Sequence, residues 1–137
     1  MSEDNINHPT HYCIGKFEVI DVIEALLLNP DYHIGCAIKY ISRAGKKVKS
    51  KELEDLQKAE WYLNRILERE LFPNIDQPIG NIHIMYNDYQ LDKYLKQALY
   101  YIVLARKSNL NTYFTMHITA AVNLLGKRIR RLMRDKY

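Results

Sequence analysis

The chain has 137 residues, of which 47% are hydrophobic and 26% are charged, and its formal net charge is +4. This length fits one globular domain, or one domain with an appended module. No stretch approaches the roughly 20 apolar residues that span a bilayer, and the N-terminus lacks the basic and apolar run of a secretory signal. The composition therefore predicts a cytoplasmic protein without membrane contact.

The charge is distributed unevenly along the chain. Residues 1–75 contain ten Lys and Arg against twelve Asp and Glu, whereas residues 76–137 contain ten against four. A basic surface favours a polyanionic ligand, either nucleotide or nucleic acid, without choosing between them. Cys13 and Cys36 have neither metal-ligand nor redox spacing, so we expect no zinc and no redox cofactor.

Apolar periodicity predicts three helices in the first half of the chain. The first covers residues 16–28 and is ended by Asn29 and Pro30. Asp31 can cap the second, which runs to about residue 44 and is ended by Gly45. After a basic linker, Ser50 is a plausible N-cap for a third helix over residues 51–71.

The second half of the chain predicts a connector and a helical hairpin. Prolines and a glycine mark residues 72–89 as the connector, with a short extended piece at 81–85, and residues 90–136 carry two amphipathic helices around a polar turn. We therefore expect an all-α fold with a three-helix module over 1–75 and a connector and antiparallel hairpin over 76–137. Because two helices bury little apolar surface, the hairpin is expected to pair with the N-terminal module or with another copy of the chain, in a homo-oligomeric helical bundle.

Basic residues gather near the end of the second predicted helix. Lys39 and Arg43 lie four residues apart and share a helix face, with Lys46 and Lys47 just beyond. Their cations suit a phosphate chain, and Tyr40 between them is a candidate to stack on a base. The alternative is that these cations only complement the helix dipole.

Acidic residues recur at steps of three on the first predicted helix. Glu18 and Asp21 are close enough to hold one Mg²⁺ with its waters, and Glu24 follows on the same side. The alternative is a solvated polar face. Magnesium bound by Glu18 and Asp21 is therefore one expectation for this segment.

Polar groups on the N-terminal loop and the third helix complete the candidate site. His8 and His11 are candidates to bind or position substrate, and Tyr12 is a candidate to stack on a base. Asp55 could orient Lys39 or Arg43 from the neighbouring helix, and Lys58 adds a further cation; both also fit an ordinary helix surface. Trp61 is expected in the core.

Four motifs occur in order: HPTHY at 8–12, Gly15 with EVID at 18–21, KYISR and a following lysine at 39–47, and EDLQKAEWYL at 54–63. Together they resemble the small phage nucleotide-kinase-like domain family, long described as a domain of unknown function. The resemblance covers about residues 7–70 and leaves out the hairpin. It implies a phage protein of the host-cell cytoplasm with a nucleotide-directed activity, such as phosphoryl transfer to a deoxynucleoside monophosphate. Neither GxxxxGK[ST] nor GxGxxG occurs in the chain.

The leading hypothesis is a magnesium-dependent nucleotide kinase-like enzyme. In it Lys39 and Arg43 contact phosphates, Glu18 and Asp21 lie near the metal, and His11 positions the substrate. Whether the chain is catalytic stays open, because an oligomeric protein that sequesters a nucleotide defence signal has the same features.

Two further alternatives rest on other parts of the chain. Glu18-x-x-Asp21 and Glu52-x-x-Asp55 faintly resemble the paired acidic motifs of all-α nucleoside-triphosphate pyrophosphatases. The basic run from Lys127 to Lys136 is compatible with nucleic-acid contact and equally with a solvated helix end, and no recognition helix is evident.

Overall fold

The computed structural model describes residues 13–14, 17–46, 48–74, 76 and 91–136. A short antiparallel pair, β1 (Cys13–Ile14) and β2 (Phe17–Glu18), precedes α1 (Val19–Leu27) and α2 (Asp31–Arg43). A 3-10 turn, η2 (Lys49–Lys51), leads into α3 (Glu52–Glu68), and α4 (Lys93–Lys107) and α5 (Asn111–Lys136) complete the chain. The all-α prediction is confirmed, with five helices in the described part of the chain.

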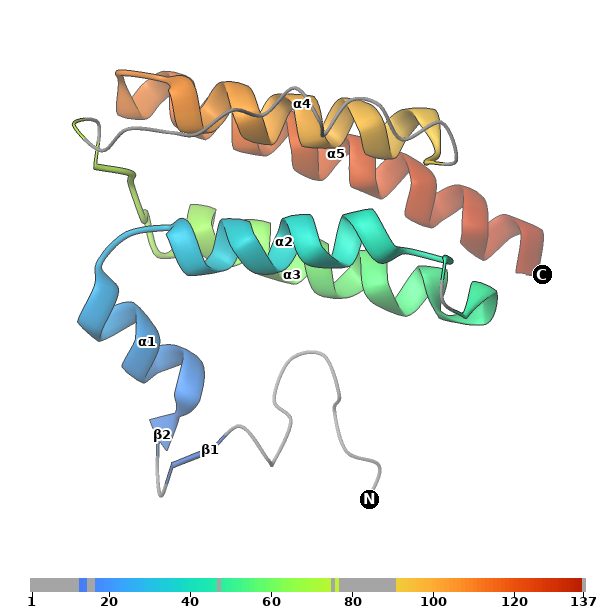
Figure 1. Ribbon diagram of the computed structural model, residues 1–137, viewed down its shortest axis with the longest axis horizontal. Coiled ribbons are helices and arrows are strands. Elements are labelled where there is room, and N and C mark those ends of the chain that lie inside the picture. Colours follow the sequence, from blue (N-terminus) through green and yellow to red (C-terminus); the bar gives the residue numbers. More distant parts are fainter. Residues whose placement is uncertain (1–12, 15–16, 47, 75, 77–90, 137) are drawn as a thin grey trace.

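The four longer helices form two antiparallel hairpins that pack on each other (Figure 1). One hairpin consists of α2 and α3, and the other consists of α4 and α5. α1 lies beside the start of α2, at the opposite end from the connection between α2 and α3. The predicted C-terminal hairpin therefore packs against the N-terminal helices of its own chain.

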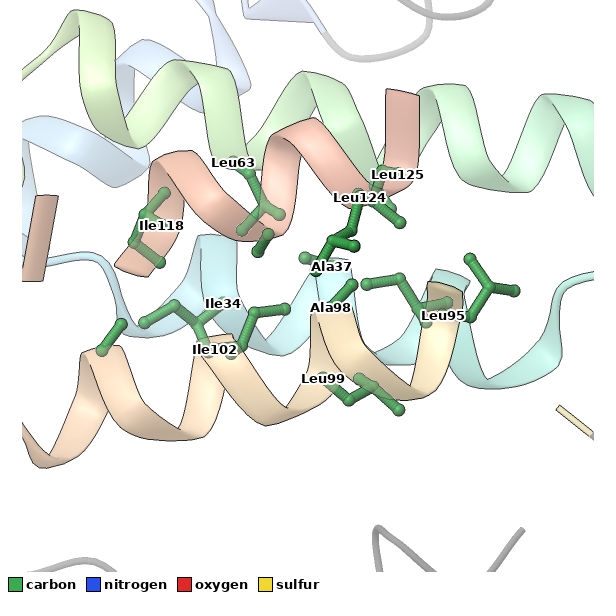
Figure 2. Close-up of a cluster of buried hydrophobic side chains, with 14 of the residues drawn as sticks. Ile34, Ala37, Leu63, Leu95, Ala98, Leu99, Ile102, Ile118, Leu124 and Leu125 are labelled. Atoms are coloured by element: carbon green, nitrogen blue, oxygen red, sulfur yellow. The ribbon is translucent and has the colours of Figure 1, made fainter. Parts of the chain in front are cut away.

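One hydrophobic core connects both hairpins. Figure 2 shows Ile34 and Ala37 from α2, Leu63 from α3, and residues of α4 and α5 in the same cluster. Fully buried alanines, such as Ala37, allow close approach of the helix backbones. Apolar residues at helical spacing along α2 to α5 are buried: Ile41, Leu56, Ala59, Ile66, Leu95, Ala98, Ile102, Ala105, Phe114, Ile118, Ala121, Leu125 and Ile129.

The junction between α1 and α2 differs in detail from the prediction. α1 begins at Val19 and not at residue 16, because Phe17 and Glu18 are extended and pair with β1. It ends as expected before Asn29, at Leu28, which has a left-handed φ of 54°. Asn29 then accepts a hydrogen bond from the Asp31 N–H through its side chain at 2.9 Å. The N-cap position of α2 is Pro30 and Asp31 is the first helical residue, so the predicted cap by Asp31 is wrong.

The connection into α3 also differs. Gly45 has a φ of +75°, as expected for a residue that ends a helix. Ser50 lies inside η2 and is not an N-cap, and α3 ends at Glu68 rather than at residue 71. The extended piece expected at 81–85 lies outside the described residues. Among the helices of the described chain, none combines the length and apolar character needed to cross a bilayer.

Candidate functional site

A hollow lies between the end of α2 and the start of α3. Its volume is about 320 Å³, which is near the lower limit of small-molecule sites at roughly 300–1,000 Å³. Three cations and two carboxylates are among its lining residues: Arg43, Val48, Lys51, Glu54, Asp55 and Lys58.

Asp55 fixes the guanidinium of Arg43 at the edge of this hollow. The Nε and Nη2 atoms of Arg43 donate to Oδ1 of Asp55 at 3.3 and 3.1 Å. The Asp55 side chain is only 10% exposed, whereas that of Arg43 is 46% exposed. The carboxylate therefore orients a guanidinium that still has donors facing solvent.

Tyr40 brings further cations to the same place. The Cζ atom of Arg43 lies 4.7 Å from the centre of the Tyr40 ring, and the Nζ atoms of Lys58 and Lys39 lie at 5.5 and 5.6 Å. The ring itself is nearly parallel to that of Tyr62, with 6.2 Å between centroids. Cation–π attraction thus holds the side chains of Lys39, Arg43 and Lys58 around one tyrosine.

Glu54 partly offsets the positive charge. Its carboxylate lies 3.3 Å from Nζ of both Lys51 and Lys58, and the hydrogen bond from Lys51, aided by Lys58, lowers the pKa of Glu54 below its ordinary value. Four cations (Lys39, Arg43, Lys51, Lys58) then accompany two carboxylates (Glu54, Asp55), so the local charge remains positive. Lys46 is exposed just after α2.

A second polar cluster lies at the other end of α2 and α3, where α1 joins them. Glu24 is the only buried residue of α1 and accepts from Nε and Nη2 of Arg65 at 2.8 to 3.2 Å. Its Oε2 also lies 2.8 Å from Nε2 of the fully buried His33. Although burial opposes ionisation, the hydrogen bonds from Arg65 and His33 lower the pKa of Glu24.

The side chain of His33 is completely buried. Burial lowers its pKa below 6.5 despite the neighbouring Glu24. The Nδ1 atom is buried and has no hydrogen-bond partner within the described chain, so a proton added there would have no acceptor. Edge-on contacts with Tyr32 and Tyr62 enclose the imidazole.

The structure brings together some of the predicted site residues and separates others. Arg43, Asp55 and Lys58 line the hollow, and Tyr40 and Lys39 lie beside it, because the Tyr40 ring contacts Arg43, Lys58 and Lys39. Asp21 lies with the other cluster, where its Oδ1 accepts from Nη2 of Arg65 at 2.7 Å. His33 and Arg43 are ten residues apart on α2, so the two clusters are about 15 Å apart along the helix.

The leading hypothesis from the sequence combined the acidic residues of the first helix with the cations of the second in one site. In the structure these two groups are separate. Glu18 lies in β2, directly before α1, and Figure 1 places α1 away from the α2–α3 connection. Among the described residues, no group of three or more His, Cys, Asp or Glu is arranged to hold a metal ion. Magnesium at Glu18 and Asp21 stays a prediction, and it would have to compete with Arg65 for Asp21. His8, His11, Tyr12 and Lys47 lie outside the described residues.

Other predicted residues have structural contacts. Glu52, which the pyrophosphatase hypothesis pairs with Asp55, accepts from Nε and Nη2 of Arg128 on α5 at 2.8 and 3.1 Å. Trp61 is half-buried against Tyr62 and Arg65 rather than fully in the core. The sequence analysis did not identify Lys51 and Glu54 as lining residues of the hollow. The spacing could have indicated them, because Lys51 directly precedes α3, three and four residues before Glu54 and Asp55, and Glu54 lies four residues before Lys58.

Comparison with known proteins corrects the family expected from the motifs. Residues 6–64 match the model of a family described as protein of unknown function (DUF3310). The matched segment covers fewer than half of the 137 residues. No curated protein and no solved structure matches the chain. The assignment to a phage nucleotide-kinase-like family is therefore wrong: the part of the chain that carries the motifs is similar to a family without an assigned activity.

Proposed function

We propose that the hollow between α2 and α3 binds a nucleotide through its phosphate group. The observation that carries this proposal is the convergence of Arg43 and Lys58 on the ring of Tyr40, beside a buried carboxylate that orients the guanidinium. A phosphate can accept from the solvent-facing donors of Arg43, and the ammonium of Lys58 adds charge.

The ligand class follows from the size and the chemistry of the hollow. About 320 Å³ suits a small molecule, and the Tyr40 ring, which contacts the lining residues Arg43 and Lys58, suits a planar base attached to an anion. The tyrosines Tyr40 and Tyr62 are held in place by their mutual stacking, so little side-chain entropy would be lost on binding.

The test is calorimetric titration with nucleoside mono-, di- and triphosphates, inorganic phosphate and the free nucleoside. Phosphorylated ligands should bind more tightly than the nucleoside. Lys58→Met should weaken binding about 10- to 100-fold, the equivalent of one charge-assisted hydrogen bond of about 1.5–3 kcal/mol. Lys93→Met is the matched control, because Lys93 also lies over a tyrosine ring, at 5.1 Å from the centre of Tyr94, but does not line the hollow.

Arg43 needs a paired substitution. Arg43→Gln alone leaves the Asp55 carboxylate buried without its partner, so the double variant Arg43→Gln/Asp55→Asn isolates the loss of the guanidinium. Equal affinity of wild type and both hollow variants for every phosphorylated ligand would refute the proposal.

The same titrations separate binding from turnover. A protein that sequesters its ligand returns it unchanged, whereas a kinase-like enzyme needs Mg²⁺ and transfers a phosphoryl group to the nucleotide. Chromatography of the titration mixtures, with and without Mg²⁺ and a phosphate donor, distinguishes these two forms of the proposal.

A further inference from the structure

The positive charge of the protein is concentrated at one end. Residues 39–58 and 127–135 contain twelve Lys and Arg against four Asp and Glu, while the rest of the chain contains eight against twelve. Figure 1 places the α2–α3 connection and the C-terminal end of α5 at the same end of the molecule, and the ion pair between Arg128 and Glu52 joins them. We name this region the basic end.

α5 extends past its partner helix at the basic end. It has 26 residues whereas α4 has 15, so α5 is longer by about 16 Å. Leu125, Ile129 and Leu132 on its inner side remain packed on the core. The inner face of the extension is therefore held by the hydrophobic core, and its opposite face is turned to solvent.

Three cations follow that solvent face. Lys127, Arg131 and Arg134 are exposed and recur at steps of four and three, opposite the buried stripe. Within the described chain none of the three forms an ion pair, in contrast to Arg128, which contacts Glu52 and Asp92. Their charges are available to an external anion.

We propose that the basic end binds single-stranded nucleic acid through its phosphate backbone, with Lys127, Arg131 and Arg134 as the principal contacts. Further cations lie at the same end of the molecule, at Lys49 on η2 and around the ring of Tyr40. A flexible single strand can adapt to cations on several elements, whereas duplex DNA is stiff over about 150 base pairs. Aromatic rings beside cations also suit unpaired bases. This binding does not require the hollow to accept a free nucleotide.

The test uses a labelled oligothymidylate and the triple variant Lys127→Ala/Arg131→Ala/Arg134→Ala. Removal of one cation that neutralises a phosphate lowers the salt slope of single-strand binding by about 0.7. The triple variant should therefore bind on the order of 100-fold more weakly than wild type at about 0.1 M salt, with a slope smaller by about two. It should keep wild-type affinity for mononucleotides, which separates this inference from the proposed function.

The matched control lowers the net charge equally at the other end of the hairpin. Asn109→Asp/Asn111→Asp/Thr112→Asp adds three negative charges at exposed positions around the start of α5, where acids also suit the helix dipole. This control variant should bind the oligothymidylate with nearly wild-type affinity. The proposal is overturned if control and triple variant lose affinity equally, if the triple variant loses none, or if a duplex of the same length binds more tightly. It is also overturned if phosphatidylserine-containing vesicles bind the protein and the oligonucleotide does not.

Discussion

Replacement of Arg65 tests whether α1 is held to the bundle by charge. Arg65 is 14% exposed and donates to Glu24, itself 10% exposed, and to Asp21. Arg65→Met keeps most of the apolar stem but leaves the Glu24 carboxylate buried without its cation. Removal of one partner from a buried ion pair costs about 3–5 kcal/mol.

Among the described residues, α1 has few other buried contacts. Glu24 is its only buried residue, and its last leucines are largely exposed, with Leu26 at 77% and Leu27 at 47%. Detachment of α1, which returns Glu24 to water, therefore costs less than retention of the unpaired carboxylate. We expect α1 to separate from an intact four-helix core.

Hydrogen–deuterium exchange measures this directly. In Arg65→Met the amides of α1 should exchange about 100-fold faster or more, because each 1.4 kcal/mol corresponds to a factor of about ten. Those of α3 and α5 should remain protected. Arg69→Met is the control, since Arg69 is 52% exposed and lies 3.7 and 3.8 Å from the same two carboxylates, and should cost less than about 1 kcal/mol. Unchanged protection of α1 in Arg65→Met, or equal loss of protection throughout the core, would refute the reasoning.

Three further predictions concern stability. Because burial lowers the pKa of His33, the unfolded chain takes up a proton first, and the free energy of unfolding should fall as the pH decreases from about 6.5 towards the folded-state pKa; His33→Gln should flatten this dependence in urea titrations. Gly45→Ala should destabilise the protein by about 1–2 kcal/mol, because φ is +75° and the new Cβ would lie 3.2 Å from Oε1 of Glu52; an unchanged midpoint of thermal unfolding would contradict this. Leu28→Asn should stabilise α1 by about 0.5–1 kcal/mol, because Leu28 is 74% exposed and has a left-handed backbone; faster amide exchange in α1 would count against it.

The bundle was predictable because its helices carry long apolar stripes. The steps of three and four between Leu56, Ala59 and Leu63 on α3 indicate a helix with one buried face. The same steps separate Ile118, Ala121 and Leu125 on α5. Helix ends were less predictable, because Asp31 is a good N-cap by residue type, whereas the N-cap position of α2 is Pro30 and Asp31 lies inside the helix.

The candidate site was predictable in part. Lys39, Tyr40 and Arg43 share one helix face, and Asp55 and Lys58 share another, so local spacing found both halves of the hollow. The contact of Glu24 with Arg65 joins residues 41 positions apart, and nothing local in the sequence indicates it. For the same reason the sequence did not indicate that Glu24 belongs to a buried ion pair. Magnesium at Glu18 and Asp21 remains a prediction.

The most direct test of phosphate binding at the hollow is a nucleotide titration of isotope-labelled protein followed by NMR. We expect saturable shifts in the side-chain signals of Arg43 and Lys58 and in the amides at the end of α2 and the start of α3, with little change around His33 and Arg65. Shifts confined to the cluster around Arg65, or to α5, would contradict phosphate binding at the hollow.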